Sequence, residues 1–515
     1  MLSKLNSVQR EAATYLDGPL LVLAGAGSGK TRVITHKIAY LLEERGYLAR
    51  NIAAITFTNK AANEMRERVG TLLQGKNTKG LMVSTFHSLG MNILRAEANL
   101  LGYKKQFSIF DSSDTWKIFS ELTNSGDKQE IRELQTQISN WKSSFITPDL
   151  AMGNADNDES KVHARIYARY QETLRAYQAV DFDDLIHLPV VLFKQHSEAL
   201  LRWQMKIHYL LIDEYQDTND CQYQLTKLLA GERAAFTAVG DDDQAIYAWR
   251  GASIENLHNL RNDHSNLRVI KLEQNYRSSQ RILKVANHLI NHNIKVFEKK
   301  LWSDHGIGDT IRVYAARDDE NEAESVVMKL MSHKFEHRTK YADYAILYRS
   351  NHLSRAFEEQ LRAQHVPYTV SGGTSFFDRA EIKDIISYLR LIVNSDDDPA
   401  FIRAITTPKR GIGNATLEKL GSHAGSRQIS LFEAAFEPSI QQLLSAHQYE
   451  DLMTFCNFIN RIQDRADKDP CAELLDEILR AINYEAWLYD TQESRQAEVK
   501  WKNVEDFIGW LKRKA

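Results

Sequence analysis

A glycine-rich turn between an apolar strand and a helix constrains the fold of this chain more than any other feature of its sequence. The turn reads AGAGSGKT over Ala24–Thr31, and it follows the apolar run Leu20–Ala24. A helix is expected from Lys30 to about Glu44, because apolar residues recur there at helical spacing. A strand, a glycine turn and a helix in this order are the context that a phosphate-binding loop requires.

The residues of this loop are expected to hold a nucleoside triphosphate. Glycines let the backbone approach the phosphates and point its N–H groups at their oxygens, and the helix N-terminus adds positive potential. Lys30 would reach the β- and γ-phosphates, and Thr31 would ligate magnesium. A chance Gly-Lys-Thr in an ordinary turn is the alternative, which the flanking strand and helix disfavour. The expected nucleotide-binding residues are Ala24 (where the general motif has glycine), Gly25, Ala26, Gly27, Ser28, Gly29, Lys30 and Thr31.

Strands alternate with helices in two parts of the chain, which predicts an α/β fold with a parallel sheet. The stretch from about Phe86 to Trp203 has a helical period and little strand character, so we expect a helical domain inserted into an α/β domain. Strands are expected again after about Arg277, and beyond Gly373 the chain is expected to be mostly helical. The further strands expected are Asn51–Phe57, Leu81–Thr85, His208–Ile212, Ala235–Val239, Thr310–Tyr314, Tyr344–Tyr348 and Tyr368–Ser371.

An acidic pair follows the strand expected at His208–Ile212. Asp213 would hold the magnesium ion, and Glu214 would orient or activate the attacking water. Such a pair alone is a weak signal, because many acidic pairs are solvated strand ends. Together with the glycine loop it predicts a magnesium-dependent NTPase, without indicating what the hydrolysis drives.

The composition excludes several classes of protein. The chain has 515 residues with 65 Lys and Arg against 68 Asp and Glu, so a net charge of −3 excludes a protein that coats nucleic acid by bulk positive charge. Three cysteines far apart in the sequence disfavour a disulfide framework or a zinc site. No apolar stretch approaches the roughly 20 residues that span a bilayer. The polar start of the chain lacks a signal-peptide core, so we expect no membrane and a cytoplasmic address.

Aromatic and polar residues follow three of the expected strands. Ligands of open parallel sheets lie beyond the carboxyl ends of the strands. Aromatic residues interleaved with polar and basic ones suit single-stranded nucleic acid, because every base has a face on which an aromatic ring can stack. Gln244 could sense the γ-phosphate. A core role is the alternative for an isolated Phe. The expected platform is Phe57, Phe86, Tyr247 and Trp249, with Thr58, Asn59 and Arg250 as polar neighbours.

Eight segments then occur in a fixed order, namely LNSVQ, AGAGSGKT, ITFTNKAANEM, TFHS, DFDDLI, LIDEYQDTN, VGDDDQAIYAWRGA and EQNYRS. In this order they resemble the UvrD/PcrA/Rep group of superfamily 1 DNA helicases, and the resemblance covers the whole chain. VFEKKLWSDHG and SGGTSFFDRAEIKD resemble its Rep branch. The resemblance implies a RecA-like P-loop NTPase sheet with inserted all-α domains and a second, incomplete RecA-like unit. The implied domains are a first motor domain (1–85 and 201–276), a helical insertion (86–200), the first part of a second RecA-like domain (277–373) and an incomplete helical insertion (374–515).

The same resemblance implies an activity and its partners. It implies an ATP-dependent single-stranded-DNA translocase and 3′–5′ DNA helicase that separates duplex DNA, uses ATP and Mg²⁺, and serves replication or repair. Its partners would be single-stranded DNA and single/double-strand junctions, and a homodimer is left open. By the resemblance, Gln9 would bind adenine, Tyr276 would stack on the base, Arg32 would assist at the nucleotide, Arg277 would reach the γ-phosphate, and His87 would touch DNA with Phe57, Tyr247 and Trp249.

A Gly-Ile-Gly turn within Thr407–Leu417 resembles a helix-hairpin-helix phosphate clamp. Backbone N–H groups and basic side chains there would hold duplex DNA by its backbone, without sequence specificity. A plain connection between two helices is the alternative. The residues expected to contact duplex DNA are Lys409, Arg410, Gly411 and Gly413.

The chain ends at Ala515 without two motifs that the family normally carries beyond its helical region, so we expect either a C-terminally truncated product or a sequence that covers only part of the protein. One of those motifs supplies a further arginine to the γ-phosphate, and such an arginine can be worth about 10³–10⁵ in rate. The expectation is therefore a chain that binds ATP but hydrolyses it poorly, and whether it is active or inactive on its own is left open. The alternatives left open are an ATP-modulated DNA-binding module and a protein-displacing translocase without strand separation.

Overall fold

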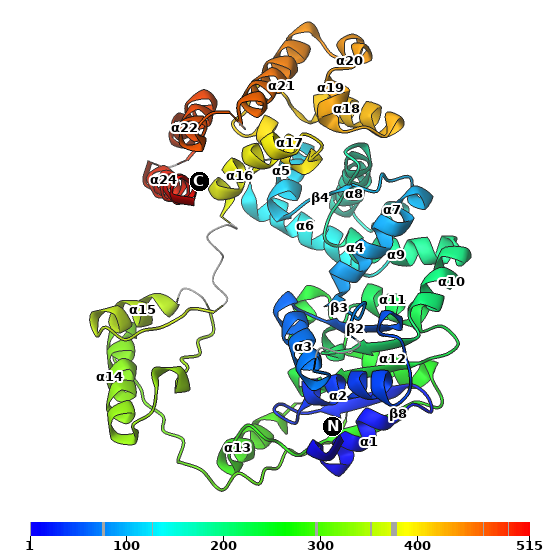
Figure 1. Cartoon of the computed structure of the whole chain (residues 1–515), viewed down its shortest axis with the longest axis vertical. Helices are drawn as coiled ribbons and strands as arrows, with labels where there is room; N and C mark the ends of the chain where they lie inside the picture. The colour runs from blue at the N-terminus through cyan, green and yellow to red at the C-terminus, as the bar shows by residue number, and fades with distance from the viewer. Residues whose placement is uncertain are drawn as a thin grey trace.

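A sheet covered by helices lies at one end of the molecule, and the helices of the C-terminal part lie at the other end (Figure 1). The N-terminus lies beside the sheet, and the C-terminus lies beside the last helix. The computed structural model describes residues 2–74, 78–125, 127–293, 297–350, 353–371, 379–466, 468–492 and 494–514.

The sheet has six parallel strands in the order β3-β2-β6-β7-β1-β8. Five of them confirm strands that the sequence predicts. The edge strand β8 was not expected, because Arg268 and Lys271 interrupt its short apolar run and only one of its sides is well buried. The strands are β1 (Leu20–Ala24), β2 (Ile52–Thr56), β3 (Met82–Thr85), β6 (Tyr209–Ile212), β7 (Phe236–Gly240) and β8 (Arg268–Leu272).

Successive residues of the central strands pack into different hydrophobic clusters. Leu20 and Val22 pack into the cluster that contains the first three helices, whereas Leu21 and Leu23 pack into the cluster that contains later ones. Both faces of the sheet are thus covered, which accounts for strands that are apolar throughout. One face carries α1 (Ser7–Thr14), α2 (Lys30–Glu43) and α3 (Asn59–Leu72), and the other carries α4 (Phe86–Glu97), α9 (Asp184–Gln195), α10 (Ser197–Lys206), α11 (Asp220–Ala230) and α12 (Glu255–Asp263).

The region between α4 and α9 is helical, as the sequence predicts, apart from a short parallel pair of strands. Both α4 and α9 pack on the sheet, although the expected helical insertion includes them. The domain boundaries at residues 85 and 200 stay a prediction. The elements of this region are β4 (Ser108–Ile109), α5 (Ser112–Thr123), α6 (Lys128–Ser143), α7 (Pro148–Gly153), α8 (Asp158–Ala176) and β5 (Ala179–Val180).

The C-terminal helices share one hydrophobic core with this region. Phe110 and Tyr170 belong to the same cluster as Tyr388 and Phe455, although Tyr170 and Tyr388 are 218 positions apart in the sequence. None of the described helices is long and apolar enough to cross a membrane. The helices are α16 (Ala380–Val393), α17 (Asp398–Thr406), α18 (Asn414–Arg427), α19 (Leu431–Ala435), α20 (Pro438–Leu443), α21 (Ala446–Ala466), α22 (Cys471–Ile482), α23 (Tyr484–Thr491) and α24 (Ser494–Lys514).

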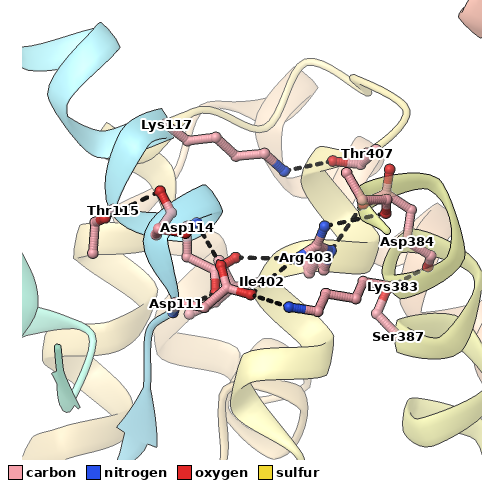
Figure 2. A network of polar contacts seen from close by, with 12 residues as sticks. Asp111, Asp114, Thr115, Lys117, Lys383, Asp384, Ser387, Ile402, Arg403 and Thr407 are labelled. Atoms are coloured by element: carbon pink, nitrogen blue, oxygen red, sulfur yellow. Dashed lines mark hydrogen bonds and ion pairs between the residues drawn. The ribbon is translucent and has the colours of Figure 1, made fainter. Parts of the chain in front are cut away.

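A buried polar network crosses the contact between these two helical parts (Figure 2). Arg403 of α17 pairs with Asp384 of α16 through Nε and Oδ1 at 2.8 Å, and its Nη1 lies 3.6 Å from Asp114 Oδ1 on α5. Lys117 of α5 donates to the Thr407 hydroxyl at 2.7 Å. Because buried charges are tolerated only with partners, this network favours one relative position of α5 and α17.

The part of the chain between the sheet and α16 contains α13 (Gln280–Ile290), α14 (Asp319–His337) and α15 (Ser354–Ala363). The strands predicted at Thr310–Tyr314, Tyr344–Tyr348 and Tyr368–Ser371 are wrong, because the structure assigns no strand to any of these described residues. Apolar alternation signals a strand only when another strand is present to pair with it, and no described strand pairs with these segments. The boundary expected at Gly373 lies outside the described residues.

Candidate functional site

The glycine loop links β1 to α2 and leaves the start of α2 open. Gly27 and Gly29 have φ angles of +69° and +94°, which favour glycine, and the Ser28 hydroxyl donates to the Gly25 carbonyl at 2.7 Å. Gly29 is the residue that precedes α2, and no side chain caps the helix. The N–H groups of the first turn therefore remain available to an anion, as the sequence predicts.

Lys30 and the acidic pair after β6 lie together at the carboxyl end of the sheet. Lys30 Nζ is 2.7 Å from Glu214 Oε2, and the Glu214 backbone N–H donates to Asp213 Oδ1 at 3.0 Å. Glu214 has a φ of +50°, a strained backbone conformation for a residue with a side chain, and such strain clusters at functional sites.

Asp213 is chemically suited to hold a divalent cation. Burial, together with the neighbouring charge of Glu214, raises the pKa of Asp213 to about 7. A bound cation would favour the charged form of this carboxylate. The carboxylate of Asp213 and the hydroxyl of Thr31 are hard oxygen donors of the kind that Mg²⁺ prefers, so the donor set fits the expected ion.

Gln216 is a residue of the site that the sequence interpretation missed. Its Nε2 donates to Glu214 Oε2 at 3.0 Å, and its Oε1 accepts the Asp241 backbone N–H at 2.9 Å. The Asp241 carboxylate in turn accepts a hydrogen bond from Gln244 Nε2. A continuous chain of polar contacts thus runs from Lys30 through the end of β6 to the residues that follow β7. The sequence could have indicated this chain of contacts, because amide and acidic side chains follow both β6 and β7.

The structure brings two residues expected at the base of the nucleotide to the loop. Gln9 is 1% exposed and donates through Nε2 to the Ser28 carbonyl at 2.9 Å. The Tyr276 backbone N–H donates to the Gly27 carbonyl at 2.9 Å, while 40% of the residue stays exposed. Asn6, which the sequence interpretation missed, connects them, because it caps α1 beside Gln9 and donates to the Tyr276 hydroxyl at 2.7 Å.

Two expected arginines lie near the loop with exposed side chains. Arg277 is so close that a Cβ atom added to Gly27 would lie 2.8 Å from its Cβ atom. Asn275 fixes this approach by donating to the Ala26 carbonyl at 2.5 Å. Arg32 lies in the first turn of α2. Arg277 is thus placed beside the phosphate-binding loop, and its guanidinium remains exposed to solvent.

Aromatic side chains gather beyond the ends of β2 and β7. Trp249 is 71% exposed, and the guanidinium of Arg250 lies 4.7 Å from the centroid of its ring. Tyr247 is 37% exposed, and its ring centroid lies 6.3 Å from that of Trp249. Phe57 is half-buried, whereas Phe86 is 2% exposed and packs in the sheet core. The expectation that Phe86 belongs to the platform is therefore wrong, since Phe86 begins α4 and its side chain packs under the sheet among the other apolar residues of this helix.

A cavity of about 680 Å³ extends from Glu214 to Phe57 and Tyr247, and Trp249 lines a separate cavity of about 700 Å³. Burial lowers the pKa of His87 on its wall, so this ring is neutral near pH 7. Thr58 also lies on the wall, and Asn59 is the exposed first residue of α3. The lining includes Phe57, Thr58, His87, Glu214, Gln216, Gln244, Tyr247 and Arg250.

The turn that precedes α18 differs from the expected phosphate clamp in one respect. The guanidinium of Arg410 donates to the carbonyls of Ala404 and Pro408 at 2.8 and 2.9 Å, so it is engaged inside the helical core. Lys409 is exposed, and Gly411 has a φ of +77°. Gly413 directly precedes α18, which no side chain caps. Binding of duplex DNA at this turn stays a prediction that depends on Lys409 and the helix N-terminus.

Comparisons with known proteins find similar sequences along nearly the whole of this chain. The family model for the UvrD/REP helicase N-terminal domain matches residues 5–265, and that for the UvrD-like helicase C-terminal domain matches residues 270–514. The ATP-dependent DNA helicase Rep of Escherichia coli (strain K12) is 51% identical over 512 residues, which cover 99% of this chain and 76% of that protein. Rep of Salmonella typhimurium gives the same identity and coverage. The ATP-dependent DNA helicase PcrA of Staphylococcus epidermidis is 41% identical over 99% of this chain and 70% of its own length.

Proposed function

Because this chain belongs to the UvrD/REP helicase family, we propose that it is an ATP-dependent DNA helicase whose cavity beside Glu214 couples nucleotide hydrolysis to movement along a DNA strand. ATP dependence and action on DNA follow from relatives that carry both in their names and match 99% of the chain. These matches give no support to the expectation that the chain hydrolyses ATP poorly. The observation that carries the proposal is the cavity, since Glu214 lines it together with Phe57 and Tyr247.

Binding of the triphosphate would rearrange the pair of Lys30 and Glu214. In this structure the two side chains neutralise each other at 2.7 Å. A triphosphate in the loop offers Lys30 stronger anions, so the lysine would turn to the phosphates and free the Glu214 carboxylate to orient the attacking water. Mg²⁺, held by Asp213 and Thr31, would neutralise charge on the phosphates. Arg277 would add its charge at the γ-phosphate when the loop closes around it.

Gln216 and Gln244 would report this rearrangement to DNA. Glu214 Oε2 accepts hydrogen bonds from both Lys30 and Gln216, so the departure of Lys30 would alter the bond to Gln216. Gln216 in turn holds the backbone of Asp241, at the start of the turn that carries Tyr247 and Trp249. Opening one base-pair step costs about 1.4 kcal/mol. A captured base gains roughly 1–3 kcal/mol by stacking on an aromatic side chain. Because the two nearly balance, hydrolysis would supply the direction of movement.

The finer features of this function are part of the proposal. They comprise 3′–5′ polarity, binding at single/double-strand junctions, use of Mg²⁺, a homodimer, a cytoplasmic address and a role in replication or repair. The residue roles assigned to Gln9, Arg32, Tyr276 and His87 rest on the family resemblance and on their places beside the loop and the cavity.

A strand-separation assay tests the proposal. A fluorescently labelled duplex with a 3′ single-stranded tail should be separated in ATP and Mg²⁺, and a duplex with a 5′ tail should not. Lys30→Ala should abolish separation and ATP turnover while it leaves strand binding in place. ATP turnover stimulated by single-stranded DNA without separation of either duplex would favour the protein-displacing translocase instead. Binding of DNA without any turnover would favour the ATP-modulated binding module.

A further inference from the structure

Three consecutive aspartates after β7 surround a lysine from a distant part of the chain. Lys299 Nζ lies 2.7 Å from Asp241 Oδ1 and 3.0 Å from Asp243 Oδ2, and it also contacts Asp242. The Lys299 side chain is 3% exposed. Among the described residues these aspartates form the group whose oxygens are close enough to hold a metal ion, and the lysine ammonium occupies that position.

The positive charge of Lys299 balances the negative charges of the three aspartates. Burial lowers the pKa of Lys299, but the carboxylates of Asp241 and Asp242 more than offset this and raise it, so the ammonium stays charged at neutral pH. Without it, three adjacent carboxylates would face one another at the edge of the cavity with no cation between them. Asp241 is also the residue that accepts the hydrogen bond from Gln244.

Lys299 belongs to a short segment, residues 297–302, which we name the strap. The Phe297 backbone N–H donates to Asp242 Oδ2 at 3.1 Å, and its ring packs in the sheet core. Leu301 lies against the phosphate-binding loop, since a Cβ atom added to Gly25 would come within 2.3 Å of its Cδ2 atom. The strap therefore touches the residues after β7 at one end and the nucleotide loop at the other.

The strap is also joined to the segment that carries Arg277. The Asn275 backbone N–H donates to the Trp302 carbonyl at 2.7 Å, and Asn275 itself donates to the Ala26 carbonyl of the loop. The Leu301 carbonyl accepts a hydrogen bond from Asn287 of α13 at 2.8 Å. A shift of the loop when it binds triphosphate would thus act directly on the strap.

We propose that Lys299 is a positioning residue for the coupled reaction: it holds Asp241 in place for Gln244, and through the strap it transmits the state of the nucleotide loop to the DNA-facing turn after β7. This inference rests on the proposed function. Besides the path through Gln216, it gives a second connection between the nucleotide loop and the turn after β7, one that starts at Gly25 and runs through the strap.

The experiment measures a coupling ratio, defined as the dissociation constant for a labelled oligothymidylate without nucleotide divided by that with a non-hydrolysable ATP analogue and Mg²⁺. For the unaltered chain we expect the ratio to differ from one by a factor of about 5–150, the usual range for coupled sites. Lys299→Met should bring the ratio closer to one, with the remaining coupling carried by Gln216, while the affinity for a fluorescent ATP analogue stays within about twofold. Lys299→Arg, which keeps the charge, should restore part of the coupling.

Two further variants keep the result decisive. Lys300→Met removes a neighbouring strap lysine whose side chain is exposed, and it should leave the ratio unchanged. Leu301→Ala removes the contact with Gly25 and should bring the ratio closer to one. This variant decides the question if Lys299→Met fails to fold by circular dichroism. In steady-state ATP turnover with saturating single-stranded DNA, Lys299→Met should lower kcat and leave KM for ATP unchanged.

The outcomes separate this inference from the proposed function. A ratio of one for the unaltered, folded chain would overturn the proposed function itself. A normal ratio for the unaltered chain, with equal ratios for Lys299→Met and Lys300→Met, would overturn only the role of Lys299. If Lys299→Met does not fold, a coupling ratio for Leu301→Ala equal to that of the unaltered chain would overturn the role of Lys299 and its strap.

Discussion

Trp249→Ala is the substitution that most cleanly separates DNA binding from folding. Because the residue is 71% exposed, most of its ring is available to a base and little of it contributes to the core. Its main described contact is the guanidinium of Arg250, and an exposed cation–π contact is worth about 0.5–1 kcal/mol. Base stacking on an aromatic side chain is worth about 1–3 kcal/mol. We therefore expect affinity for single-stranded DNA to fall about 5- to 150-fold, with a loss of unfolding free energy no larger than about 1 kcal/mol.

Fluorescence anisotropy with a labelled oligothymidylate at fixed salt measures the affinity, and urea denaturation measures the stability. Phe335→Ala is the matched control, because Phe335 is an aromatic residue of α14 that is 87% exposed and lines neither the cavity beside Glu214 nor the one that Trp249 lines. It should leave the affinity unchanged. An equal affinity for Trp249→Ala and the unaltered chain would refute the stacking role, and a large loss of stability would show that Trp249 belongs to the core.

Three further predictions concern other parts of the molecule. Arg403→Met should lower the unfolding free energy of the helical part by about 3–5 kcal/mol, because the buried Asp384 carboxylate loses its cationic partner. Urea denaturation measures this, and a change below about 1 kcal/mol would contradict it. Burial lowers the pKa of Lys37 to about 7, so between pH 7 and 9 the unfolded chain binds more protons and stability should rise by up to about 1.4 kcal/mol per pH unit; thermal melts of Lys37→Met should lack this rise. Lys409→Ala should reduce the salt slope of duplex binding by about one and leave single-strand binding unchanged, whereas Arg410→Ala should destabilise the fold; equal slopes for Lys409→Ala and the unaltered chain would exclude the clamp.

The nucleotide loop could be predicted from the sequence because its parts are neighbours in the chain. The apolar run before Ala24, the glycines and the helix from Lys30 are local signals, and each one follows from backbone conformation or from helical period. Asp213 and Glu214 were also found, because the carboxyl ends of parallel strands meet at one edge of a sheet. Gln9 was placed beside the loop only through the family resemblance.

The remaining parts depend on contacts that no local pattern encodes. The role of Gln216 requires β6 to lie beside β7, and the role of Lys299 requires a segment far along the chain to return to the sheet. Phe86 was assigned to the surface because a strand end cannot be distinguished from the first turn of a buried helix by its composition. The apolar residues around Val313 predicted a strand, but pairing is a property of two segments and not of one.

The central claim is that a triphosphate in the glycine loop changes how the chain holds a single DNA strand. Titration of a labelled oligothymidylate with and without a non-hydrolysable ATP analogue and Mg²⁺, on the unaltered chain and on Lys30→Ala, tests it most directly. We expect the nucleotide to change the dissociation constant of the unaltered chain by at least about fivefold and to leave that of Lys30→Ala unchanged. Identical constants for the unaltered, folded chain at saturating nucleotide would contradict the account.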